Sequence, residues 1–233
     1  MKVAAKVVLV FVAVLALPLL LSQPAWAVAC TTTPTFTLWE AATGGCTDTD
    51  KIYTFISSGT GGDLALPGTS TFSVGTVLQP PSSALHTVAF GFGVTLAPGT
   101  YNLEYTIQIT TQSPQPIFGT VNLDTTVPGG TCGTSPCSAI KNIFEANGTH
   151  VITDLQSDNG VPSGTPSFPA GLTFIDVHEV FTVPTGGVLS GATNTYTELN
   201  VPQTTPAPAS LILLGLGLVG AGAGVLRRKI KAA

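Results

Sequence analysis

Three aspartates and one Asp–His pair are the side chains whose types and spacing could support chemistry. Asp48 and Asp50 would share one face of a strand, and with Asp63 they offer oxygen ligands of the kind that calcium prefers. Their spacing matches no known calcium loop, so we expect no cofactor and keep calcium at these aspartates as the alternative. Asp176 and His178 also share a face, as half of a metal site or of a catalytic pair, although a solvated polar stripe is the commoner reason for such a pair.

Sequence motifs for hydrolysis are absent from the chain. It contains neither the Gly-x-Ser-x-Gly elbow of a serine hydrolase nor the His-Glu-x-x-His motif of a zinc protease. Its twelve acidic residues could still supply the paired carboxylates that cleave a glycosidic bond, because the sequence does not give their distances. We therefore predict that the chain is not an enzyme and keep a secreted hydrolase as the alternative.

The charged residues are distributed unevenly along the chain. Of eight Lys and Arg residues, two lie near the N-terminus and four near the C-terminus, which leaves only Lys51 and Lys141 for the body. All twelve acidic residues lie between Glu40 and Glu198, so the body has a net charge of −10. Such a surface repels nucleic acid and anionic lipid and attracts divalent cations, so we expect no nucleic-acid partner.

Four cysteines allow three disulfide pairings. Proximity in the sequence favours Cys30 with Cys46 and Cys132 with Cys137. The first bond would close a loop of about 15 residues and stabilise the fold by about 3 kcal/mol in the chain-entropy model. Zinc is the alternative, but no histidine lies at ligand spacing from either pair.

Short strands dominate the body. Residues 101–110 alternate apolar and polar side chains, as in a strand with one dry and one wet face. Turns rich in Gly, Pro and Asn separate it from the other expected strands, at residues 51–57, 71–77, 86–96, 117–124, 141–146, 150–155, 172–183 and 189–199. The pattern predicts an all-β, antiparallel β-sandwich of the jelly-roll or immunoglobulin-like type, as one ectodomain over residues 28–199.

The N-terminus has the features of an export signal. Lys2 and Lys6 precede an apolar run, and Ala25-Trp26-Ala27 supplies the small residues that signal peptidase reads. Residues 1–27 are therefore predicted to be a signal peptide. An uncleaved helix is one alternative, and a lipoprotein processing site before Cys30 is another.

The C-terminus has the features of a membrane segment. A Pro-rich spacer at residues 200–209 leads into seventeen uncharged residues, about 25 Å long as a helix and at the lower limit for crossing a bilayer. A basic stop follows, formed by Arg227, Arg228 and Lys229. The positive charges should stay in the cytoplasm, so the body should face outward from the inner membrane. A simple permanent anchor is one explanation of residues 210–233.

This tail resembles the PEP-CTERM sorting domain, in which a proline motif, a short Leu/Gly-rich membrane segment and a basic stop occur in that order. The residues that match its sorting motif are Pro206, Ala207, Pro208, Ala209 and Ser210, with Ala207 where the family has glutamate. The resemblance implies recognition by a membrane-embedded sorting protease of the exosortase type. It also implies an inner-membrane intermediate with a periplasmic body, and then delivery to the outer surface or the extracellular matrix of a bacterium that makes exopolysaccharide.

A second motif lies at the start of the body. Residues 46–55 resemble a Cys…Asp-Lys-aromatic-x-Phe motif of many such exported proteins, for which the resemblance implies no activity. Its structural explanation is a disulfide at Cys46, a turn at Asp50 and Lys51, and Tyr53 and Phe55 in the core. We therefore expect a non-catalytic surface or matrix role linked to exopolysaccharide or biofilm. A carbohydrate- or calcium-binding module is the alternative.

Overall fold

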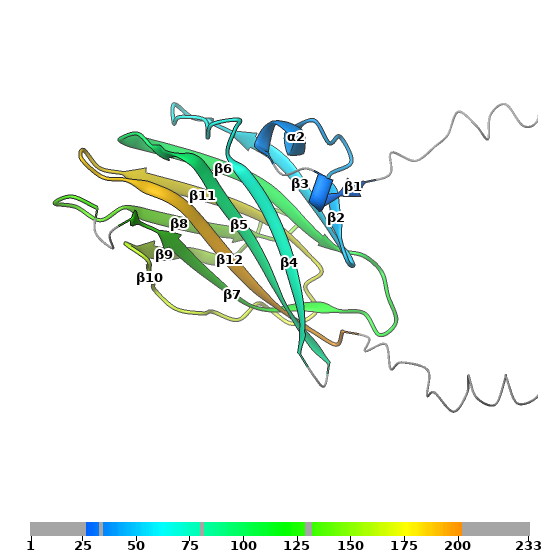
Figure 1. Cartoon of the computed structure of the whole chain (residues 1–233). Helices are drawn as coiled ribbons and strands as arrows, with labels where there is room; N and C mark the ends of the chain where they lie inside the picture. The colour runs from blue at the N-terminus through cyan, green and yellow to red at the C-terminus, as the bar shows by residue number, and fades with distance from the viewer. Residues whose placement is uncertain (1–26, 33–34, 80–81, 129–131, 202–233) are drawn as a thin grey trace, which may run out of the picture. The chain divides into compact units, whose positions relative to one another are not determined.

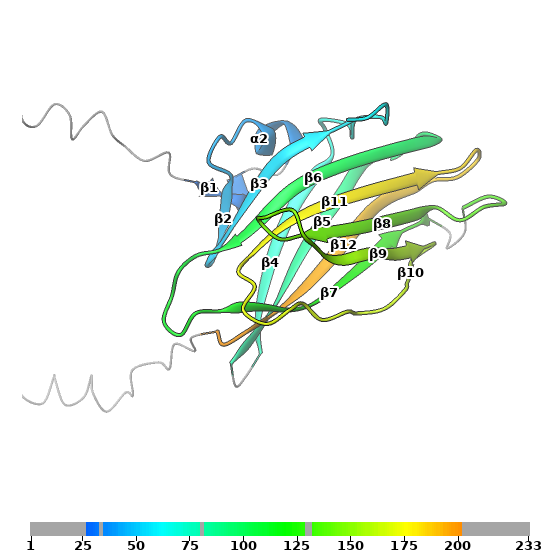
Figure 2. The ribbon, with the colours of Figure 1, turned by 180° about the vertical axis from the view of Figure 1, so that it is seen from behind.

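The computed structural model describes residues 27–32, 35–79, 82–128 and 132–201, which form two β-sheets packed face to face (Figure 1 and Figure 2). The predicted all-β sandwich is thereby confirmed. Nearly all of the predicted signal peptide lies outside the described residues, as do the sorting motif, the membrane segment and the basic stop. The helices within the described ranges include none with the length and apolar character that a membrane crossing requires.

The larger sheet has eight strands, antiparallel except for the first pair. In spatial order they are β1 (Val28–Ala29), β2 (Cys46–Asp48), β3 (Lys51–Ser58), β6 (Gly99–Ile109), β11 (Phe174–Val183), β8 (Ser138–Phe144), β9 (His150–Asp158) and β10 (Val161–Pro162). The smaller sheet has four antiparallel strands, β4 (Thr71–Gln79), β5 (Ser83–Leu96), β12 (Leu189–Leu199) and β7 (Ile117–Thr126). All nine strands expected from the sequence are present.

The chain crosses repeatedly from one sheet to the other. In four pairs of strands that follow each other in the chain, one strand lies in each sheet. These pairs are β3–β4, β5–β6, β7–β8 and β11–β12. These eight strands lie side by side as a row of four two-strand units, and β1, β2, β9 and β10 extend the larger sheet at its two edges. The frequent crossings favour the jelly-roll alternative over the immunoglobulin-like one.

The core forms where the apolar faces of the two sheets meet. On β6, alternate side chains from Tyr101 to Ile109 are buried and those between them are half-buried or exposed, as the alternation predicted. A short helix, α2 (Phe36–Glu40), adds the fully buried Trp39 to one end of this core. The Trp39 ring stacks on Phe72 at 3.9 Å, and its indole N–H donates to the carbonyl of Tyr53.

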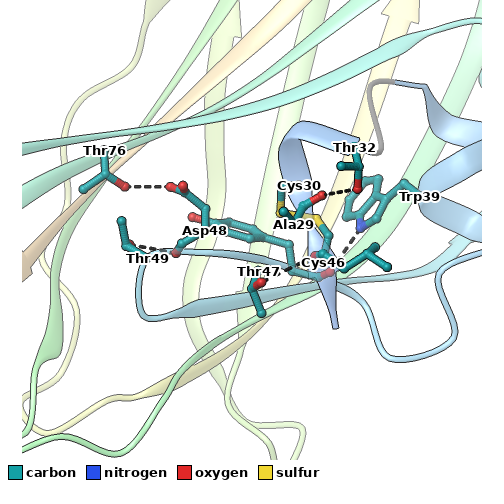
Figure 3. The surroundings of a disulfide bond; sticks show 11 residues. Ala29, Cys30, Thr32, Trp39, Cys46, Thr47, Asp48, Thr49 and Thr76 are labelled. Atoms are coloured by element: carbon teal, nitrogen blue, oxygen red, sulfur yellow. Dashed lines mark hydrogen bonds between the residues drawn. A yellow bond between two sulfur atoms is a disulfide. The ribbon is translucent and has the colours of Figure 1, made fainter. Parts of the chain in front are cut away.

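Both predicted disulfides are present. Cys30 in the short 3-10 helix η1 (Cys30–Thr32) is bonded to Cys46 of β2, as Figure 3 shows, and Cys132 is bonded to Cys137. Disulfides persist in oxidising compartments, so the ectodomain belongs outside the cytoplasm.

Candidate functional site

The first polar cluster lies between the sheets and is centred on Lys51 at the start of β3. The ammonium donates to Glu198 Oε2 on β12 at 2.5 Å and to Asp50 Oδ1 at 2.9 Å. His86 Nε2 on β5 lies 2.6 Å from the same Glu198 oxygen, and Lys51, His86 and Glu198 are all about 1% exposed. Asp50, His86 and Glu198 have the donor atoms of a metal site. The positive charge between these carboxylates, however, is already supplied by the ammonium of Lys51, which donates to both Asp50 and Glu198.

A hydrogen-bonded chain links this cluster to the edge of the sandwich. Thr76 Oγ1 on β4 donates to Asp48 Oδ2 at 2.7 Å and lies 2.9 Å from His86 Nδ1 (Figure 3 shows the Asp48–Thr76 bond). Burial raises the pKa of Asp50, but the hydrogen bond and charge of Lys51 outweigh burial, so its pKa lies below the usual value. Asp48 and Asp50 are therefore already engaged by side chains of the fold.

The third predicted calcium candidate lies elsewhere. Asp63 accepts from the amide of Asn102 at 3.4 Å, near the end of β3 where Ser58 pairs with Leu103. Asp48 and Asp50 lie at the opposite end, where Lys51 pairs with Ile109 on β6. The three aspartates therefore do not converge on one position.

The second polar cluster surrounds Lys141 of β8, deep in the core. Its ammonium donates to Asn194 and, at 3.1 Å, to Tyr196, both on β12, and lies 3.6 Å from Glu179 Oε1 on β11. The same Glu179 oxygen accepts from Tyr105 and Asn194, each at 2.7 Å. Burial lowers the pKa of Lys141 to about 8, although the Glu179 carboxylate acts in the opposite direction.

The outer surface consequently carries only negative charge. Lys51 and Lys141 are the only basic Lys or Arg residues between residues 27 and 201, and both are buried. Their partners Glu198 and Glu179 are buried too, and Asp50, which is only 12% exposed, is also paired with Lys51. The other nine of the twelve acidic residues are exposed or half-buried. Most of the net charge of −10 predicted for the body is therefore a charge of its surface.

A third cluster lies on the outer face of the larger sheet. His178 of β11 stands opposite Glu104 of β6, and Asp176 is two residues before it on the same face. His178 Nε2 is 3.3 Å from Asp176 Oδ2 and 3.5 Å from Glu104 Oε1. Because all three side chains are 28–41% exposed, the cluster is open to solvent.

The sequence identified Asp176 and His178 but missed Glu104. Alternation placed Glu104 on the wet face of its strand, yet only the register between β6 and β11 brings it beside His178. The buried lysines were missed as well. Their signal was that Lys51 is in phase with the buried Tyr53, and Lys141 with the buried Ile143.

An open groove of about 610 Å³ lies between β9 and residues 163–167. The segment is hydrogen-bonded to β9 through Ser163 and to β7 through the carbonyl of Pro166, so it bridges the two sheets at this edge. The polar residues that line the groove are Thr153, Asp154, Ser163, Thr165 and Ser167.

No family model matches the chain, and no curated protein matches it. Among solved structures, it is similar to peruvianin-I, a cysteine peptidase from Thevetia peruviana latex, with 11% identity over 55% of this chain and a TM-score of 0.27. The match spans 61% of that peptidase.

Two carbohydrate-binding modules are also similar. The mannan-recognising module TmCBM27 shows 11% identity over 63% of this chain and 98% of its own, with a TM-score of 0.29. The family 11 module from Clostridium thermocellum shows 12% identity over 68% and 93%, with a TM-score of 0.25. These values are too low to transfer an activity or a ligand to this chain.

Proposed function

We propose that the chain is an exported, non-catalytic component of a bacterial surface or extracellular matrix. We propose further that its ectodomain associates with acidic polysaccharide through divalent cations. The observation that supports this proposal is the surface of nine carboxylates without a lysine or arginine. Such a surface repels a polyanion directly, and a divalent cation shared between carboxylates of both partners removes that repulsion.

Retention on an acidic polysaccharide gel tests this function. The full chain should be retained on alginate coupled covalently to agarose beads in the presence of calcium and released by a chelator, and a neutral dextran gel should not retain it. The triple variant D124N/E145Q/D154N removes three surface charges and should lower calcium-dependent retention about two-fold or more. Equal retention in calcium and in chelator would exclude the cation bridge.

The matched control changes side chains without changing charge. The variant T106S/T195S carries two conservative substitutions on β6 and β12 and should be retained like the wild type. If the control lost retention as much as the charge variant, the effect would come from altered folding rather than from charge.

The route to the surface is the second part of the proposal. We propose that residues 210–233 form a PEP-CTERM-like sorting tail that an exosortase-type protease removes near Pro206 and Pro208. The test is the intact mass of the mature protein from its native host, with and without that protease. Mature protein that keeps residues 211–233 in normal cells would instead support a permanent membrane anchor.

The groove beside β9 favours a second candidate function, binding of a neutral carbohydrate. Its hydroxyl side chains and Asp154 offer the hydrogen-bond donors and acceptors that sugar hydroxyls need. A neutral-oligosaccharide screen should then find binding that a chelator leaves unchanged and that T153V and D154N weaken. Asp154 has a φ of 50°, a conformation that asparagine also tolerates, so D154N should keep the backbone of β9.

A further inference from the structure

The three side chains on the outer face of the larger sheet converge as metal ligands do. Their donor atoms, His178 Nε2, Asp176 Oδ2 and Glu104 Oε1, all lie within 4.8 Å of one another. A zinc ion bonded at about 2.1 Å in tetrahedral geometry has neighbouring ligand atoms about 3.4 Å apart. The nitrogen-to-oxygen distances of 3.3 and 3.5 Å match that spacing, and the shorter one also joins His178 and Asp176 by a hydrogen bond.

Neighbouring residues hold the ligands in place. Ser57 Oγ donates to Glu104 Oε2 at 3.0 Å, which leaves Oε1 toward His178. The ring of Phe144 lies 4.6 Å from the His178 ring and restricts its orientation. Outer contacts of this kind orient the ligands of metal sites and tune their affinity.

Asp176 provides an independent sign that a ligand belongs here. Its second oxygen, Oδ1, is buried and has no hydrogen-bond partner among the described residues. Buried polar atoms are normally paired, and an orphaned one calls for an explanation such as an ion. A cation at Oδ2 would stabilise the negative charge that Oδ1 shares with it in the same carboxylate.

No positive side chain competes for the site. Both lysines of the ectodomain are buried elsewhere, in the clusters with Glu198 and Glu179. The surrounding field is therefore negative, which favours the binding of a divalent cation at these three residues.

We propose that Glu104, Asp176 and His178 bind one divalent first-row transition metal ion, for which zinc is the probe. The imidazole ligand selects against calcium and magnesium, which take oxygen ligands. Three protein ligands leave one position of a tetrahedral zinc ion to water or to an oxygen of another molecule. This site goes beyond the proposed function, because zinc would bind whether or not the chain binds polysaccharide.

Zinc titration of the full chain without a histidine tag, against a competing chromophoric chelator, tests the site. The wild type should bind one zinc ion. H178A should weaken its affinity about 100-fold or more, D176N and E104Q should weaken it, and S57A should weaken it about 10-fold through its effect on Glu104. Cobalt should give visible d–d absorption without a thiolate band, because all four cysteines are in disulfides.

Two control variants separate this site from general attraction of cations. H150A removes an exposed histidine that contacts the same Phe144 ring at 3.9 Å, and D124N removes one exposed charge from β7. Both should bind zinc like the wild type, and all variants should keep the wild-type melting temperature. Absence of zinc binding by the wild type, wild-type affinity in H178A, or an equal loss in H150A would each overturn the assignment.

Discussion

Replacement of Lys141 by methionine tests how the core tolerates its buried charges. The methionine fills a similar volume but removes the ammonium that faces Glu179, Asn194 and Tyr196. Glu179 is fully buried and would be left without a cation. Breaking a buried ion pair by removing one partner costs about 3–5 kcal/mol, a large share of the 5–15 kcal/mol typical of a domain.

The double variant K141M/E179Q separates the charge from the packing. A glutamine at position 179 keeps an oxygen that can accept from Tyr105 and Asn194, but it carries no charge that needs a partner. We therefore expect the double variant to recover most of the stability lost in K141M. The difference from additivity is the coupling energy of the pair.

Urea unfolding of the oxidised full chain carrying W26F, followed by circular dichroism and by the fluorescence of the buried Trp39, measures these free energies. Coincidence of the two transitions supports a two-state analysis. A K141M variant within about 1 kcal/mol of the wild type would refute the reasoning, given the expected cost of about 3–5 kcal/mol. A double variant no more stable than K141M would show that packing, not charge, is responsible.

Three further predictions concern the buried lysines and the buried Trp39. Burial lowers the pKa of Lys141 from 10.5 to about 8, so between these pH values the unfolded chain binds more protons than the folded one. The free energy of unfolding should therefore rise from pH 8 to 9.5 by up to about 2 kcal/mol. The K141M variant should not show this rise. Urea unfolding at each pH measures this, and a fall over that range would contradict it. Amine acetylation of the native protein should spare Lys51 and Lys141, which should react only after unfolding. Peptide mass spectrometry reads the sites, the urea-unfolded chain is the reactive control, and acetylation of either lysine in the native protein would contradict its burial. W39A should lower the free energy of unfolding by about 3–5 kcal/mol, because the fully buried ring packs on Phe72; a loss below about 1 kcal/mol in urea would contradict the packing.

The strands and the disulfides could be predicted because their signals are local. Alternation along β6 identifies its buried face without knowledge of any other strand, and turn residues end each run. Cys132 and Cys137 are only five residues apart, so proximity was a sufficient guide to their pairing. Helix α2 (Phe36–Glu40) was missed because it is five residues long, too short for helical periodicity to show.

The clusters could not be predicted because they depend on pairing between distant strands. Lys51 and Glu198 are 147 residues apart in the sequence, and Glu104 reaches His178 only through the register of two strands. Alternation could place each residue on a face but could not say which residue stands opposite. Asp63 illustrates the opposite case. It is close to Asp50 in the sequence, and was therefore grouped with it, but the two lie at opposite ends of β3.

The buried lysines and the anionic surface have one structural origin in β12. Its inner face carries Asn194, Tyr196 and Glu198 at alternate positions, which receive Lys141 and Lys51 from the opposite sheet. A slip of β12 by two residues would displace Glu198 by about 6.8 Å and leave buried charges unpaired. The polar positions therefore favour one alignment of the two sheets, which apolar contacts alone specify less sharply. With both ammonium groups committed to that alignment, the positive charge that balances the outer carboxylates must come from solution, which is why metal ions are the ligands to test first.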